Sequence, residues 1–226
     1  MAQQVAASPF EVTFNSQNPF NTNDSPRQSA GGASRSGGLE SQCGGFNKAN
    51  KLNTMIPITP YTMEKVNLTT ESHPNFYVYV PETGAEQAFF SVMGVDNDFE
   101  YQTFLDLPAK EGVMQISLPK SLNGIEVGKN YRWSFVMICN QYLEPDSPLV
   151  DGQVKRVALA QEPSNDLSGQ EKAAIYGQQG LWVDALDNLA SFVAAQPDHV
   201  QGQATWNQFL SSVGLEAVAT TPLITY

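Results

Sequence analysis

The chain has 226 residues and a formal net charge of −11 at neutral pH. This excess of acidic groups repels a phosphate backbone and an anionic membrane surface, so we expect no nucleic-acid partner. The chain has no run of about eighteen apolar residues, so we expect no membrane-spanning helix. Only 15% of the residues are charged, and Asn, Gln, Ser and Thr are abundant, a profile typical of exported all-β proteins.

Residues 1–45 form an N-terminal arm that begins with a strand-like stretch. Phe10, Val12 and Phe14 alternate with polar residues, which is the period-two pattern of a half-buried strand. A tract rich in Asn, Ser and Gly follows, and its lack of large apolar residues predicts a flexible spacer. The strand therefore has no partner nearby in the sequence. It can fold back onto its own domain or add to the sheet of a neighbouring copy.

Residues 46–160 predict a β-sandwich. Short apolar stretches are separated by turn signals such as PETG and EPDSP, at a spacing of about ten residues. Seven antiparallel strands around a tryptophan and a cysteine are immunoglobulin- or fibronectin-like in outline, a likeness of fold that implies no activity. The predicted strands are Met55–Ile58, Phe76–Val80, Ala88–Met93, Phe99–Asp106, Val113–Leu118, Tyr131–Asn140 and Val150–Leu159.

The two cysteines lie in different surroundings. Cys139 ends the strand-like run YRWSFVMIC, whose alternate residues from Tyr131 onward share one face and point to a core. Cys43 closes the Gly-rich tract of the arm. A bridge between the two would pin the arm to the sheet and stabilise the fold by roughly 4–5 kcal/mol through loop closure. The alternative is two unrelated reduced thiols.

Two features predict the compartment. An even cysteine count fits an oxidising environment. The first residues, MAQQ, resemble those around a small-residue cleavage site, so we expect a processed, secreted chain. The extracellular space or cell surface is the expected location, with the periplasm as an alternative. An ordinary start methionine on a cytosolic protein is the competing interpretation.

Residues 161–226 change to a helical period. The sequence SGQE, from Ser168 to Glu171, predicts a capping box at a helix start. The following residues take the spacing of a tetratricopeptide helix–turn–helix repeat, with a glycine at the turn and a proline that stops the second helix. A generic helical hairpin is the alternative, and Phe192 departs from the repeat pattern. The matching residues are Ala173, Tyr176, Gly180, Trp182, Ala185, Leu189 and Pro197.

The sequence carries no recognisable catalytic motif, so we expect neither an enzyme nor a cofactor. It lacks a nucleophile elbow, an HExxH helix and the cysteine or histidine spacing of a zinc site. His73 precedes a predicted strand and His199 starts a predicted helix, which favours structural roles. The loop at 96–100 offers carboxylate and amide oxygens to calcium, but a polar hairpin turn is the simpler interpretation, and we expect no metal.

Four stretches follow the arm in order: HPNFYVYVPE at 73–82, GKNYRWSFVMIC at 128–139, DGQVKRV at 151–157 and the helix pair AIYGQQGLWVDALDNLA. This combination resembles a cyanobacterial family of exported proteins, domain-of-unknown-function family 928, over nearly the whole chain. The resemblance implies export and a Cys43–Cys139 disulfide. It implies no activity.

We therefore predict a secreted structural protein that assembles with copies of itself. The strand from about Ser8 to Phe14 would enter the sandwich of the next subunit. Burying Phe10, Val12 and Phe14 there would give a gross gain of roughly 4–9 kcal/mol before ordering costs. A head-to-tail exchange that does not close on itself produces a filament.

Two other functions compete with this prediction. The first is a monomeric exported binding module, in which Tyr77, Tyr79 and Phe89 form a surface that stacks on carbohydrate. The alternative for these aromatic residues is that they face the helices. The second, ranked below it, is a hydrolase with an unrecognised site. Deleting the arm separates the self-assembling protein from the binding module, because it should abolish assembly and leave sugar binding intact.

Overall fold

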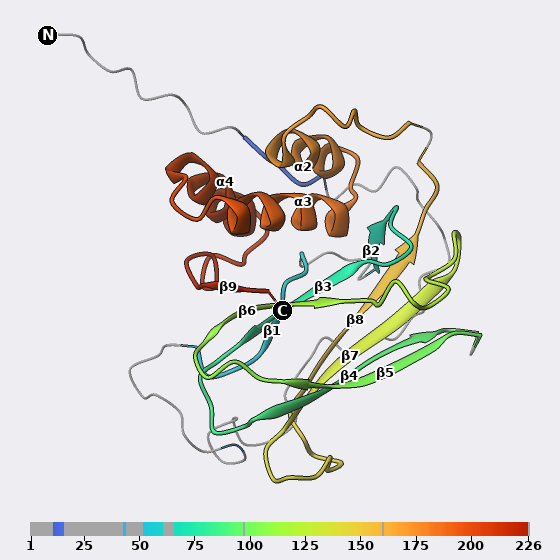
Figure 1. The fold of residues 1–226 in the computed structure, drawn as a ribbon, viewed down its shortest axis with the longest axis vertical. Helices are drawn as coiled ribbons and strands as arrows, with labels where there is room; N and C mark the ends of the chain where they lie inside the picture. Colours follow the sequence, from blue (N-terminus) through green and yellow to red (C-terminus); the bar gives the residue numbers. More distant parts are fainter. Residues whose placement is uncertain are drawn as a thin grey trace, which may run out of the picture.

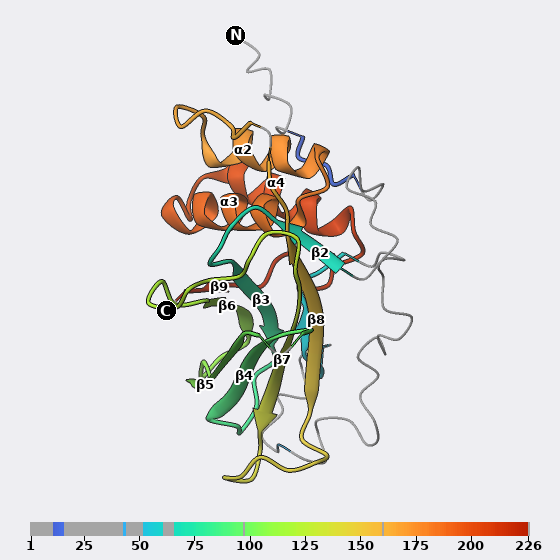
Figure 2. The ribbon, with the colours of Figure 1, turned by 90° about the vertical axis from the view of Figure 1, so that its right-hand side faces the viewer.

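Within the residues that the computed structural model describes, two β-sheets pack face to face and three helices cover one end, as Figure 1 shows and Figure 2 confirms from the side. The strands are β1 (Ile56–Pro57), β2 (Val66–Thr69), β3 (Asn75–Val80), β4 (Gln87–Gly94), β5 (Glu100–Asp106), β6 (Gly112–Ser117), β7 (Asn130–Ile138), β8 (Leu149–Arg156) and β9 (Leu223–Ile224). The helices are α2 (Gly169–Gln178), α3 (Trp182–Ala195) and α4 (Val200–Ser211). The structure describes residues 11–15, 43, 52–60, 66–96, 98–159 and 161–225.

The two sheets are mixed in direction. One has the strand order β1-β3-β6-β9 and the other β2-β8-β7-β4-β5. Each predicted strand has a counterpart, but β2 and β9 were not predicted, and they make the parallel pairs, β2 with β8 and β9 with β6. The expected all-antiparallel arrangement was therefore wrong. Both missed strands are short, and each pairs with a strand far away in the sequence.

The core lies between the inner faces of the sheets. Phe76 of β3 meets Phe90 of β4 at a ring separation of 5.3 Å and Trp133 of β7 at 5.7 Å. Gly152 of β8 lies opposite Trp133, and a Cβ there would come within 2.7 Å of the indole, so glycine gives the ring its space. As predicted, alternate residues of β7 turn into this core: Tyr131, Trp133, Phe135 and Met137.

The helical end follows the local signals of the sequence. The Ser168 hydroxyl accepts from the Glu171 amide at 3.3 Å, and the Glu171 carboxylate accepts from the Ser168 amide at 2.8 Å, which confirms the capping box. Gly180 adopts a φ of +74° in the turn between α2 and α3, a region that favours glycine. No described helix is long and apolar enough to cross a membrane.

After α4 the chain returns to the sandwich. The amide of Val113 donates to the Pro222 carbonyl at 2.8 Å, and β9 then runs alongside the start of β6. The segment expected to be helical thus also contributes a short strand to the four-stranded sheet. This return ties the helices to the sandwich at a second point.

Candidate functional site

Strand β5 forms one edge of the five-stranded sheet. At its two ends, Leu107 donates its amide to the Glu86 carbonyl, and the Phe99 carbonyl accepts from the Gly94 amide, both at 2.8 Å. Backbone groups turn to alternate sides along a strand, so odd-numbered residues of β5 bond to β4 and even-numbered residues face outward. Among the strands of the described residues, none pairs with this outer side. Glu100, Gln102 and Phe104 therefore direct backbone groups to an edge that another strand can join.

A groove of about 360 Å³ lies between β5 and β6. In Figure 2 the two strands lie on the same side of the sandwich. Tyr101 and Leu105 line the groove from β5, and Met114 and Ile116 line it from β6. Because β9 pairs only with Val113 and Met114, it leaves the rest of this side of β6 uncovered by a paired strand of the described chain. The volume is within the range of natural ligand sites.

The described part of the N-terminal arm, residues 11–15, packs on the helices. The segment, drawn in blue in Figure 1, runs beside α2. Val12 is only 1% exposed, and the half-buried Phe14 meets the Trp182 indole edge-on at 5.1 Å. Residues 11–15 form no strand, contrary to the prediction from their alternating pattern. Phe10, the third predicted assembly residue, lies outside the described residues.

The surface that receives this segment is formed by Gly177, Gln178 and Trp182, and we call it the socket. The Asn15 amide donates to the Gly177 carbonyl at 2.9 Å, and its side-chain amide lies 3.4 Å from the Gln178 carbonyl. Both carbonyls belong to the last turn of α2, where helical partners run out. A Cβ on Gly177 would lie 2.4 Å from the Thr13 carbonyl oxygen, so this glycine lets the segment approach.

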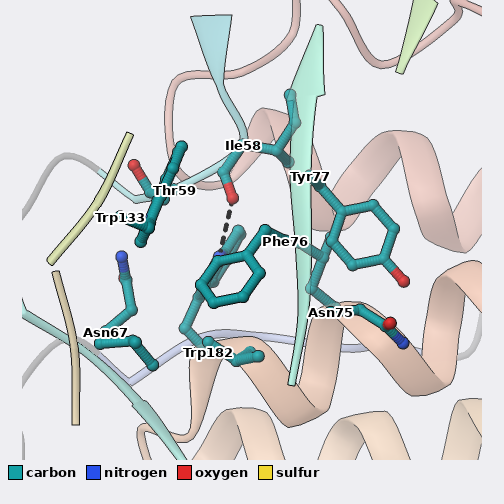
Figure 3. A pocket seen from close by; sticks show the side chains of 11 residues that line it. Ile58, Thr59, Asn67, Asn75, Phe76, Tyr77, Trp133 and Trp182 are labelled. Carbon is teal, nitrogen blue, oxygen red and sulfur yellow. Dashed lines mark hydrogen bonds between the residues drawn. The ribbon is translucent and has the colours of Figure 1, made fainter. Parts of the chain in front are cut away.

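Trp182 connects the socket to the sandwich. Its indole is 1% exposed, stacks on Phe209 of α4 at 4.9 Å, and donates from Nε1 to the Ile58 carbonyl at 3.0 Å. Figure 3 shows the indole directed at this carbonyl beside Phe76. A cavity of about 20 Å³ separates the layers here, room for roughly one water molecule. One side chain therefore contacts the segment, the helices and the sandwich.

Two carboxylates of α3 reach the strands below. Asp184, 2% exposed, accepts from the amide and the hydroxyl of Thr70, and burial raises its pKa to about 6 against the opposing effect of these bonds. Asp187 accepts from the Asn75 side-chain amide and the Tyr77 hydroxyl, both at 2.6 Å. Burial and the nearby Asp187 raise the pKa of Tyr77 well above its usual value. The sequence analysis did not identify either carboxylate.

The model of one protein family, Domain of Unknown Function (DUF928), matches residues 30–223. The chain belongs to this family. The match includes both walls of the groove and the whole socket, and it begins after the segment at 11–15. No curated protein matches the sequence. The family therefore confirms the predicted resemblance and assigns no activity.

In this DUF928 protein the predicted cysteine pair is joined by a disulfide. Cys43 and Cys139 are bridged, with their Cα atoms 4.5 Å apart. Cys43 is buried next to Met137, with 3.4 Å between the two sulfurs. The root of the arm is thus fixed to the end of β7.

The aromatic residues proposed for carbohydrate stacking do not form one surface. Tyr77 and Tyr79 are 3% and 0% exposed, and the Tyr79 hydroxyl donates to Glu111 at 2.8 Å, so that part of the expectation was wrong. Phe89 belongs to the other sheet, where its ring lies 5.4 Å from that of Phe104. Phe104 is 61% exposed. Of the predicted platform, only the half-buried Phe89 lies beside an exposed aromatic ring, that of Phe104.

Both histidines have structural contacts. One ring nitrogen of His73 lies 2.9 Å from the Leu122 carbonyl. His199 caps α4, because its Nδ1 accepts from the Gly202 amide at 2.9 Å. In the loop at 96–100, Asp98 forms an ion pair with Lys129. Among the described residues, no three His, Cys, Asp or Glu side chains gather as a metal site would require.

Proposed function

We propose that this DUF928 protein is a secreted structural protein that assembles with copies of itself. The strand from about Ser8 to Phe14 of one subunit would add to the β5 edge of the next. Its apolar side chains would enter the groove between β5 and β6, and its backbone would bond to Glu100, Gln102 and Phe104. The observation that carries this proposal is the outer edge of β5, with which no described strand pairs, beside a groove lined in part by Tyr101, Leu105, Met114 and Ile116.

The composition of β5 supports this use of the edge. Natural edge strands are usually protected by charged side chains, especially lysine, or by proline, a bulge or very short length. The sequence of β5, EYQTFLD, has seven residues without proline or lysine, its charges lie only at its two ends, Glu100 and Asp106, and it pairs with β4 without a break in register. Phe104 on this strand is largely exposed. A regular edge of this kind is a template for an added strand.

The arm has the reach and the anchoring that such an exchange requires. The stretch from Asn15 to Gln42 has roughly 28 residues and can span at most about 90 Å when extended. The Cys43–Cys139 disulfide holds its root on the sandwich, so a pull on the arm is transmitted to the core. If every arm adds to the next subunit without closing a ring, the product is a filament.

Several finer predictions belong with this proposal. The disulfide supports secretion, because bridged cysteines persist mainly in oxidising compartments. We propose further that the sandwich is of the immunoglobulin or fibronectin type, that α2 and α3 are tetratricopeptide-like, and that the protein is cyanobacterial. In this proposal the protein needs no catalytic residue and no cofactor.

Size-exclusion chromatography with light scattering tests the proposal, using the non-reduced full chain and a chain that begins at Gln42. We expect concentration-dependent polymers from the full chain and monomers from the truncated one. Monomers from both would contradict assembly. Polymers from both would contradict the role of the arm and point instead to β5 edges pairing with each other.

A monomeric carbohydrate-binding module is the second candidate. It is favoured by the exposed Phe104 ring, which the half-buried Phe89 supports from the neighbouring strand, because an exposed aromatic ring can pack against a sugar ring. Replacing Phe104 by Ala should then abolish retention on a polysaccharide affinity gel while the chain stays monomeric. Equal retention of the unchanged chain and the Phe104→Ala variant would contradict this candidate.

A further inference from the structure

The contact between the segment at 11–15 and the socket has the features of a peptide-binding site. One apolar side chain, Val12, is buried, and a second, Phe14, packs edge-on against Trp182. The Asn15 amide adds a main-chain hydrogen bond to the end of α2. Apolar anchors at alternate residues combined with a backbone bond are how proteins recognise extended peptides.

The glycine at position 177 is a second feature that indicates a peptide-binding site. In the interior of a helix, glycine is less favourable than alanine by about 1 kcal/mol. Here the missing side chain makes room for the backbone of another segment, because a Cβ would lie 2.4 Å from the Thr13 oxygen. The socket is therefore shaped for a chain lying across α2.

We infer that the socket is a peptide site for the chain's own segment, and that its occupation keeps the segment away from the groove of another subunit. This inference rests on the proposed function, which places the same Val12 and Phe14 in the β5–β6 groove. One segment cannot occupy both sites. Because both sites bury the same side chains, assembly gains only the difference between them, and emptying the socket promotes assembly.

Gly177→Ala in the full chain tests the inference. Alanine suits the helix but collides with the Thr13 backbone, so the segment should leave the socket while Val12 and Phe14 stay available to the groove. We expect the protein concentration needed for assembly to fall about tenfold, which corresponds to about 1.4 kcal/mol. In dilute monomer, the Asn15 amide should lose its protection from hydrogen exchange.

A second variant, Asn15→Pro, removes the amide that bonds to Gly177 and changes no residue of the helices or the sandwich. It should shift assembly in the same direction as Gly177→Ala. Glu11→Ala is the matched control, because Glu11 is exposed and lies in the same segment. This control should keep both the amide protection and the assembly threshold of the unchanged protein.

The two readouts separate failure of the inference from failure of the proposed function. Reduced assembly by Gly177→Ala would overturn the inference and make the socket itself the site where arms join subunits. An unprotected Asn15 amide in the unchanged monomer would overturn it as well. If neither the unchanged chain nor any variant assembles, the proposed function fails, and the proposed control of assembly fails with it, even where the amide is protected.

Discussion

The boundary of the sandwich under the helices and its boundary at β5 are covered in different ways. At the helical end, Trp182, Asp184 and Asp187 reach down from α3 and bond to groups of the strands or the loops beside them. On the β5 side, the outward backbone groups face an edge with no paired strand among the described residues. The first boundary is closed by buried polar contacts, and the second has no pairing strand in the described part of the chain.

This difference predicts which substitutions should change the stability of the monomer and which should change its assembly. A buried polar contact is costly to break, because each group left without a partner loses its hydrogen bond in a place that water does not reach. An exposed strand edge is already solvated, so changing it costs the monomer little. Substitutions at the helical end should therefore act mainly on folding, and substitutions at the β5 edge mainly on assembly.

The largest expected effect is that of Trp182→Ala. It removes a buried indole, its stack on Phe209 and its bond to the Ile58 carbonyl, and should lower the free energy of unfolding by about 3–5 kcal/mol. Urea unfolding of the non-reduced chain measures this loss. Trp182→Phe keeps a ring in place and should cost less. A loss below about 1 kcal/mol for the alanine variant would show that the helices are not held through this residue.

The second effect is the pH dependence that Asp184 confers. Its pKa is about 6 in the folded protein and near 3.8 when solvated, so between these values the folded state binds the extra proton. The free energy of unfolding should therefore fall as pH rises from 4 to 6, by about 3 kcal/mol at most, and then level off.

Urea unfolding across this pH range checks the slope in the unchanged protein and in Asp184→Asn. Asparagine cannot ionise, and its side-chain oxygen can still accept from the Thr70 amide. The variant should therefore lose this part of the pH dependence. The same slope in both proteins would mean that another group causes it.

Much of the fold could be predicted from local sequence signals. Alternating apolar residues located β3 to β8, and the SGQE box located the start of α2. β2 and β9 escaped prediction because four and two residues are too short to show a period, and their partners are remote in sequence. The alternating pattern in the arm correctly predicted that Val12 is buried, but it did not predict the surface that buries it. Such a pattern indicates which side chains are buried and carries no information about their partner.

The candidate site could be predicted only in part. The sequence indicated an apolar segment without a pairing partner nearby in the chain. The position of β5 at the edge of its sheet depends on the strand order, which no local pattern specifies. Asp184 and Asp187 did leave a signal, since they lie three residues apart in the run LWVDALDNLA, which is apolar except for these two residues and Asn188, and so share a helix face. Two carboxylates in such a run indicate buried polar contacts.

The smallest effect on stability is expected from Gln102→Pro. This variant also tests most directly whether the β5 edge, unlike the helical end, acts on assembly and not on folding. The amide of Gln102 faces the open edge, so proline removes no bond of the β4–β5 ladder and should change the free energy of unfolding by about 0.5 kcal/mol or less. An added strand would lose this donor and meet the proline ring, and the concentration needed for assembly should rise at least about tenfold. Gln102→Ala keeps the amide and is the matched control, so light scattering should find it assembling like the unchanged chain. If the proline variant is as stable as the control and still assembles equally well, subunits do not join through the β5 edge.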